Sequence, residues 1–139
     1  TYSTKSLHAA VVEIFALAGA HVRYSTIQNW STNIYNLVTK RARAEEHATV
    51  EWIDCNLGSG ITMKYPPVIL AGAYARGNVI SRAMAQQDQD LDTGARMIHV
   101  APHTSSHVIS KSISLSGGIA TYRGKTLIAP AAHHAKSMN

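Results

Sequence analysis

Three of the eight histidines have a spacing that could bind a metal. His99, His103 and His107 follow one another at intervals of four residues, which on a helix would align three imidazoles for zinc. Pro102 lies between them, and residues 97–100 have the composition of a strand, so a helix is disfavoured here. We therefore expect no dedicated three-histidine site.

Other reactive side chains offer weaker candidates. His133 and His134 are weak metal candidates, because neighbouring residues of a strand point to opposite faces and only one could face a site. Cys55 is the single cysteine and cannot form an internal disulfide, so we interpret it as a small, partly buried strand residue. Residues 86–92 carry three carboxylates but lack the glycine and terminal Glu of an EF-hand loop, which favours a solvated turn.

The elements that carry these side chains are predicted to be strands. Short stretches of the chain have every second residue apolar, and that period is typical of strands. Val22, Tyr24, Thr26 and Gln28 would share one strand face. Val50, Trp52 and Asp54 would share another. The predicted strands are residues 11–15, 22–28, 35–39, 50–54, 61–65, 79–83, 97–100, 108–113 and 121–123.

Glycine-rich segments separate these strands and predict an all-β fold with tight corners. A sandwich, a barrel and a β-helix all fit this pattern. Asn-Gly and Asp-Gly dipeptides, the strongest hairpin signal, are absent, which disfavours a meander of tight hairpins. The serines at 105–106 and 110–116 suit ladders between stacked coils, although they would equally suit an exposed strand face. We expect one domain over residues 1–139.

Composition and charge exclude several classes of protein. A hydrophobic share of 45% and a charged share of 15% are typical of a packed body rather than a disordered chain. The net charge is +5, but the basic cluster at 40–43 is followed at once by Glu45 and Glu46, so we expect no nucleic-acid partner. No apolar run approaches the roughly 20 residues that cross a bilayer, so we expect no membrane association. The chain starts without Met and ends without a closing signal, which predicts truncation.

Several ordered segments resemble the SufB/SufD family of iron–sulfur cluster assembly proteins. Residues 28–30, Gln-Asn-Trp, and 92–94, Asp-Thr-Gly, favour the SufB branch. The resemblance covers nearly the whole chain and implies a right-handed parallel β-helix, here truncated. The segments that carry it are residues 7–13, 24–30, 35–41, 63–66, 92–99, 109–114 and 121–124.

The resemblance implies a scaffold subunit that does not turn over a substrate alone. Such a subunit receives sulfur and iron in a SufBCD-type complex and passes the nascent cluster to apoproteins. Its implied partners are SufD-like and SufC-like subunits and a cysteine desulfurase or sulfur carrier. The implied cofactor is a transient iron–sulfur cluster of the full-length complex, with none expected in this fragment. A cytoplasmic location is implied, or a plastid one in a photosynthetic eukaryote.

The family's sulfur-transfer path maps onto Gln28, Trp30 and Lys40 of this chain. Lys40 would place a positive charge near a persulfide, Gln28 would donate hydrogen bonds, and Trp30 would wall the path. A structural interpretation places Gln28 and Trp30 on the inner face of one strand as ordinary core residues. The family's sulfur-accepting and cluster-site cysteines are not present in this chain, and Cys55 matches neither position.

Two other functions remain open from the residues alone. A β-helical carbohydrate-active protein would need carboxylates along one strand face, whereas we expect the acidic residues of this chain in turns. A β-helical structural or interaction module without sulfur chemistry would use exposed strand ends for assembly, and self-association of the chain would follow.

Overall fold

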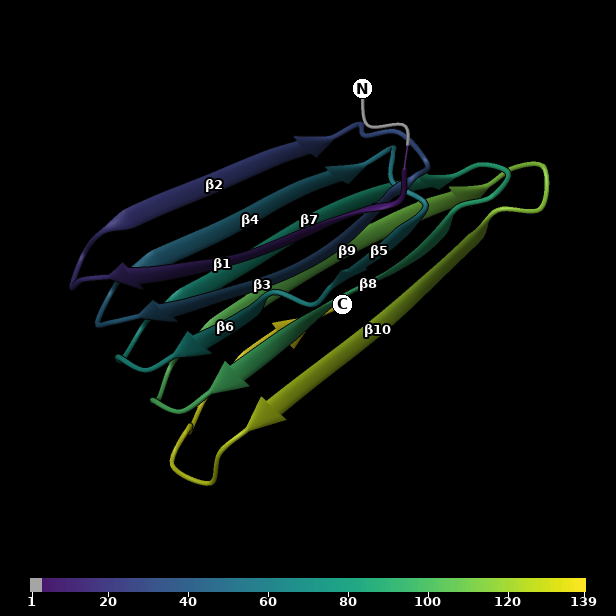
Figure 1. Ribbon diagram of the computed structural model, residues 1–139. Helices are drawn as coiled ribbons and strands as arrows, with labels where there is room; N and C mark the ends of the chain where they lie inside the picture. The colour runs from purple at the N-terminus through teal and green to yellow at the C-terminus, as the bar shows by residue number, and fades with distance from the viewer. Residues whose placement is uncertain (1–3) are drawn as a thin grey trace.

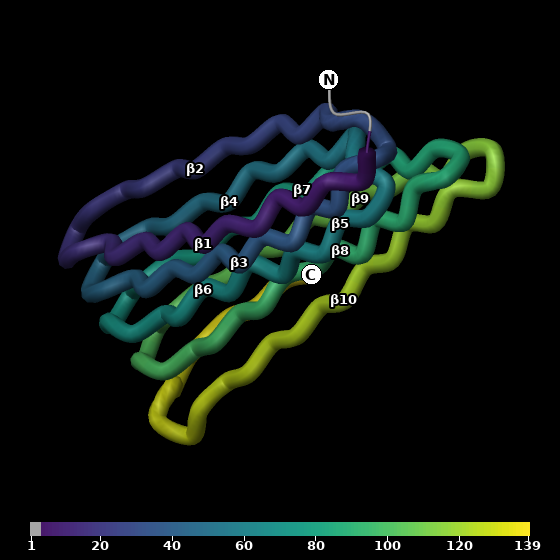
Figure 2. Tube along the Cα trace, viewed as in Figure 1, coloured from purple at the N-terminus to yellow at the C-terminus, as the bar shows by residue number. Residues whose placement is uncertain are grey.

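A computed structural model describes residues 4–139 as an all-β structure of stacked coils (Figure 1). Each coil adds one strand or a pair of short strands to a first sheet and one strand to a second (Figure 2). The described region contains no helix long and apolar enough to cross a membrane. The strands are β1 (Ser6–Ala16), β2 (His21–Gln28), β3 (Ile34–Ala44), β4 (Thr49–Asn56), β5 (Ile61–Lys64), β6 (Pro67–Leu70), β7 (Arg76–Ala85), β8 (Asp90–His99), β9 (Ser105–Ser114), β10 (Ile119–Ile128) and β11 (Lys136–Met138).

All pairings between these strands are parallel, which identifies a parallel β-helix and excludes a barrel or a hairpin sandwich. The first sheet has the order β1-β3-β5-β8-β10, with β6 pairing both β3 and β8. The second has the order β11-β9-β7-β4-β2. The predicted fold is therefore confirmed. The order also places β1, β2, β10 and β11 at sheet edges.

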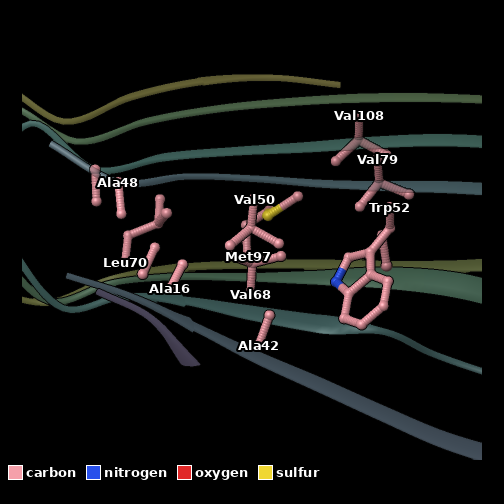
Figure 3. Close-up of a cluster of buried hydrophobic side chains, with 13 residues drawn as sticks. Ala16, Ala42, Ala48, Val50, Trp52, Val68, Leu70, Val79, Met97 and Val108 are labelled. Atoms are coloured by element: carbon pink, nitrogen blue, oxygen red, sulfur yellow. The ribbon is translucent and has the colours of Figure 1, made fainter. Parts of the chain in front are cut away.

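The core lies between the two sheets and is built from the alternate residues that point inward. Strand β4 shows this alternation clearly, since Val50, Trp52 and Asp54 are buried and share one face, as predicted. Leu70 and Met97 of the facing sheet pack into the same cluster (Figure 3). Most core side chains are small, so successive coils stack closely and the layers repeat.

One corner of the coils carries a ladder of residues in the left-handed conformation. Gly19, His47, Tyr74, His103 and His134 all have positive φ, and each lies two residues before a strand of the second sheet. The rings from His47 to His134 stack with centroid separations of 4.9, 4.8 and 4.9 Å, which matches the spacing of paired strands. Stacking along the ladder offsets part of the strain of the left-handed backbone.

The first sheet is interrupted where Tyr65 and Pro66 separate β5 from β6, which begins with Pro67. Strand β3 pairs with β5 through Leu37 and resumes pairing with β6 at Ala42. Proline has no N–H to donate, so a continuous ladder cannot form across this pair. The break lies beside Lys40, in the middle of β3.

The predicted strands are all present, and most extend further than predicted. Two strands were missed. Strand β6 begins with a proline, and β11 is only three residues long. The polar run 86–92 is a turn only up to Gln89, and Asp90 and Asp92 begin β8.

Candidate functional site

A cavity of about 250 Å³ opens among β1, β2 and β3 and reaches Lys64 of β5. Its walls combine apolar side chains, aromatic rings and buried polar groups. Gln28, Trp30 and Lys40 all line it, so the three residues predicted for the sulfur-transfer path meet at one cavity. The complete lining is His8, Ala10, Val12, Tyr24, Thr26, Ile27, Gln28, Trp30, Asn36, Val38, Lys40 and Lys64.

Gln28 is the centre of a buried hydrogen-bond network at one end of the cavity. It is the last residue of β2 and points inward. Its amide nitrogen donates to Ser59 Oγ at 2.9 Å and to Thr62 Oγ1 at 2.8 Å. Its amide oxygen accepts from Asn36, whose own oxygen accepts from His8 Nδ1 at 2.9 Å. The network therefore runs from the partly exposed His8 to the interior and fixes the orientation of Gln28.

Trp30 lies in the loop after β2 and not on the strand face with Gln28, which corrects the structural interpretation given above. Its ring packs edge-on against His8, with ring centroids 4.3 Å apart. The Trp30 carbonyl accepts from the Ser59 N–H at 2.8 Å. At Gly58, a Cβ atom would collide with the Trp30 backbone, so only glycine lets the two segments approach. Trp30 is thus held at the rim of the cavity.

Lys40 is a buried residue of β3 that lines the cavity and forms an ion pair with Asp54. Its Nζ lies 2.6 Å from Oδ1 of Asp54 and 3.0 Å from Oγ1 of Thr26. The Lys64 ammonium lies 3.4 Å from the same oxygen. The side chains of Lys40, Asp54 and Lys64 are only 3%, 4% and 4% exposed. We call these three residues the Lys–Asp–Lys triad.

The triad places two ammonium groups against one carboxylate. Burial alone would raise the pKa of Asp54, but the Lys64 and Lys40 ammoniums together lower that pKa below its ordinary value. Burial lowers the pKa of Lys64, Asp54 raises it in part, and Lys40 lowers it further. Lys40 also lies over the rings of Tyr24 and Trp52, 5.0 and 5.4 Å from their centroids. Aromatic faces attract a cation, so they help to hold the charge of Lys40 in the interior.

Comparison with known proteins decides the family. The family described as "SUF system FeS cluster assembly, SufBD core domain" matches residues 1–139. The chain belongs to the SufBD family. It is 60% identical over 123 residues to the iron–sulfur cluster assembly protein SufB of Bacillus subtilis, covering 88% of this chain and 26% of that protein. It is 57% identical over 136 residues to a SufBD family protein of Mycobacterium tuberculosis, covering 98% of this chain and 16% of that protein.

The SufBD chain therefore spans about a quarter or less of the length of these curated relatives. Both relatives are named as iron–sulfur cluster assembly proteins, which supports a role in that process. The resemblance to SufB/SufD proteins in the sequence is confirmed.

Sequence reasoning found three of the residues at the cavity and missed other polar residues that line it or pair with its lysines. Asn36, Asp54 and Lys64 were not singled out, although all are buried on inward-facing strand positions. The expectation that acidic residues lie in turns was wrong for most of them, and Asp54 is even buried in β4. The acidic residues that lie in strands are Glu13, Glu51, Asp54, Asp90 and Asp92. The signal was present, because Asp54 follows Val50 and Trp52 at every second position. A carboxylate at the inward position of a strand whose other inward residues are apolar is expected to be buried, and a buried carboxylate needs a partner of opposite charge.

The histidines do not form a metal site in the described part of the chain. Among residues 4–139, no group of three His, Cys, Asp or Glu residues is placed to hold a metal ion. His99 is buried at the end of β8, His103 lies in the corner ladder, and His107 is exposed on β9. His133 and His134 lie in the turn before β11 rather than on a strand, and only His134 joins the ladder.

Cys55 lies on β4 with its backbone paired between Ile27 and Arg82. It is partly exposed, in agreement with its interpretation as a small strand residue. Its neighbours Asp54 and Asn56 point into the core, so Cys55 points to the outer face, away from the cavity.

Proposed function

We propose that this SufBD chain is the β-helical core of a scaffold subunit for iron–sulfur cluster assembly, and that sulfur in transit passes through the cavity at Gln28, Trp30 and Lys40. The observation that carries the proposal is that these three side chains line the same cavity. They differ in chemical type, and Lys40 comes from a different strand than Gln28. Their convergence is expected of a functional site and is not needed for a core of small apolar layers.

The chemistry of the cavity suits a sulfur species. Hydrosulfide and persulfide are soft, polarisable and anionic near neutral pH. Lys40 supplies a cationic side chain held by Asp54, and the Gln28 network supplies buried polar groups in fixed orientations. Trp30 and the apolar wall residues reduce contact with bulk water, which strengthens each electrostatic interaction and limits loss of sulfur to solvent.

The scaffold role implies partners. We propose that the subunit acts with SufD-like and SufC-like subunits and receives sulfur from a cysteine desulfurase or sulfur carrier in the cytoplasm or a plastid. The iron–sulfur cluster is cargo, assembled in the complex and passed to apoproteins. Cys55 alone does not provide the several ligands that a cluster requires. In this proposal the chain supplies the interior cavity, and the ATPase and sulfur donor supply the chemistry.

Complementation tests the proposal. The intact protein carrying Lys40→Met is expressed in cells that lack their own SufB, and the activity of iron–sulfur enzymes is measured. We expect a loss of at least about tenfold, since removal of a charged hydrogen-bond donor from a buried site costs about 1.5–3 kcal/mol. Lys111→Met, on the outer face of β9, is the matched control and should complement normally. Normal enzyme activity with Lys40→Met, in protein that is folded and equally abundant, would remove Lys40 from the path.

The two other functions considered from the sequence are less well supported. A carbohydrate-active site would need a pair of carboxylates across a sugar-binding groove, whereas the lining of this cavity contains none. A purely structural module has no evident use for two lysines and one carboxylate buried together, because replacement of a buried ion pair by apolar residues is often neutral or stabilising. Self-association through the exposed sheet edges is compatible with the scaffold role.

A further inference from the structure

The Lys–Asp–Lys triad has more positive than negative charge inside the protein. Lys40 and Lys64 both approach Oδ1 of Asp54, at 2.6 and 3.4 Å. A buried carboxylate can balance only one buried ammonium. An unbalanced buried charge costs several kcal/mol unless it is paired or loses its proton.

Among residues 4–139, no other carboxylate pairs with the triad to offer the second negative charge. The remaining titratable side chains that line the cavity are His8 of β1 and Tyr24 of β2, and neither is a carboxylate. Thr26 donates its hydroxyl to Asp54 and adds no charge. Among the described residues, Asp54 is thus the one carboxylate that pairs with either lysine.

The space beside the triad is also suited to an anion. Both lysines line the cavity of about 250 Å³, whereas Asp54 does not. The cavity is several times larger than a single water molecule requires. Ala10, Val12 and Val38 form its apolar part, so an occupant must give up much of its hydration. That loss is smallest for a large, weakly hydrated ion and largest for a small or doubly charged ion.

We propose that the cavity is a binding site for one weakly hydrated monoanion, with Lys40 and Lys64 as its two cations and Asp54 as the internal counter-ion that keeps the empty site folded. This inference rests on the proposed function only in naming the physiological occupant, a hydrosulfide or persulfide anion. The anion is held without a covalent bond.

Lys64 has a separate role from Lys40 in this site. Lys40 is tied to Asp54 and Thr26 by short hydrogen bonds, whereas Lys64 makes one long contact with Asp54. Burial lowers the pKa of Lys64, and the neighbouring Lys40 lowers it further, although Asp54 raises it in part. An anion bound beside Lys64 supplies a second negative charge, which favours the ammonium form of Lys64 and raises that pKa.

Iodide is a suitable probe because it is large, weakly hydrated, singly charged and visible by anomalous scattering. Crystals of the intact protein are soaked in sodium iodide, and thiocyanate affinity is measured in solution by calorimetry. We expect an anomalous peak in contact with both lysine ammonium groups and thiocyanate binding that is stronger than chloride binding. Absence of iodide from the cavity, with iodide bound elsewhere on the protein, overturns the inference.

Variants of opposite expected sign separate this site from simple structural damage. Lys64→Met should weaken thiocyanate binding at least about tenfold, while the outer-face control Lys111→Met should not change it. Asp54→Asn removes the competing carboxylate and should strengthen binding, although it destabilises the empty protein. Weakening by Asp54→Asn, or no effect of Lys64→Met, would contradict the assignment.

The anion measurements do not depend on cluster assembly, so the two proposals can fail separately. Iodide bound at both lysines, together with normal cluster assembly by Lys40→Met, supports the anion site and removes the sulfur path. Defective assembly by Lys40→Met with no anion in the cavity overturns the anion site and leaves the sulfur path standing.

Discussion

Lys40 and Asp54 form an ion pair of 2.6 Å inside the β-helix, with both side chains at most 4% exposed. They come from opposite sheets, since Lys40 lies in β3 and Asp54 in β4. The pair therefore joins the two walls of one coil across the core. Lys64, from the next coil, reaches the same carboxylate oxygen and extends the connection along the β-helix axis.

Removal of both lysines should destabilise the protein by more than the sum of the single replacements. In Lys40→Met or Lys64→Met, the remaining lysine still pairs with Asp54. In the double variant the buried carboxylate has no cation, which should lower the free energy of unfolding by about 3–5 kcal/mol. Urea denaturation of the wild type, both single variants and the double variant measures the coupling. Strictly additive losses would show that the two lysines do not share Asp54.

His99 should make the fold sensitive to mild acid. It is fully buried, with Nδ1 2.8 Å from Thr104 Oγ1 and Nε2 3.0 Å from Ser106 Oγ. Burial lowers the pKa of His99, so the unfolded chain binds a proton more readily than the folded chain. The stabilisation is complete above about pH 6.5 and is lost as pH falls through the lower folded pKa, with a slope of at most about 1.4 kcal/mol per pH unit.

The measurement for His99 is the free energy of unfolding between about pH 4 and pH 8, a range that includes the ordinary histidine pKa of about 6.5. His99→Gln should flatten the acid side of the profile. The exposed His107 provides the control, since His107→Gln should leave the profile unchanged. An identical pH profile in wild type and His99→Gln would show that His99 is not the titrating group.

Gly58→Ala should displace Trp30 from the rim of the cavity. The added methyl group would meet backbone atoms of Asn29 and Trp30, which cannot rotate away as a side chain could. Overpacking of this kind costs about 1–3 kcal/mol, so we expect lower stability and a shift in tryptophan emission. Gly124→Ala is the control, because the atoms nearest to its methyl group all belong to the Tyr122 side chain, which can rotate away. Unchanged emission in Gly58→Ala would indicate that the loop accommodates the methyl group.

The isolated chain of 139 residues should self-associate. Strand β10 is at a sheet edge and leaves Tyr122, Leu127 and Ile128 between 42% and 51% exposed. Open sheet edges with apolar side chains pair readily with other chains. Light scattering after size-exclusion chromatography measures the mass, and Tyr122→Lys with Ile128→Lys should shift it toward the monomer. A wild-type monomer at high concentration would contradict this expectation.

The sequence predicted the strand faces better than it predicted the partners across the core. Alternation placed Thr26 and Gln28 on one face and Trp52 and Asp54 on another, as the structure has them. It could not show that Lys40, from a third strand, meets Asp54, because that contact depends on how coils stack. Strand β6 was missed since Pro66 and Pro67 obscure the pattern. The resemblance supplied the β-helix and named Gln28, Trp30 and Lys40, but it gave no role to Lys64, although residues 63–66 are part of it.

The ladder from Gly19 to His134 has a further consequence for how this protein can change. Each rung except the last, His134, donates its backbone N–H to the carbonyl of the residue just before the next rung, as His103 does to His133 at 2.8 Å. These hydrogen bonds thus fix the register between successive coils at this corner. An insertion at this corner would shift the register of the coils that follow it. The loop from Asn29 to Asn33 lies at the opposite corner, outside this ladder. This loop, and with it the rim of the cavity at Trp30, can therefore change in length or shape while the two sheets stay aligned.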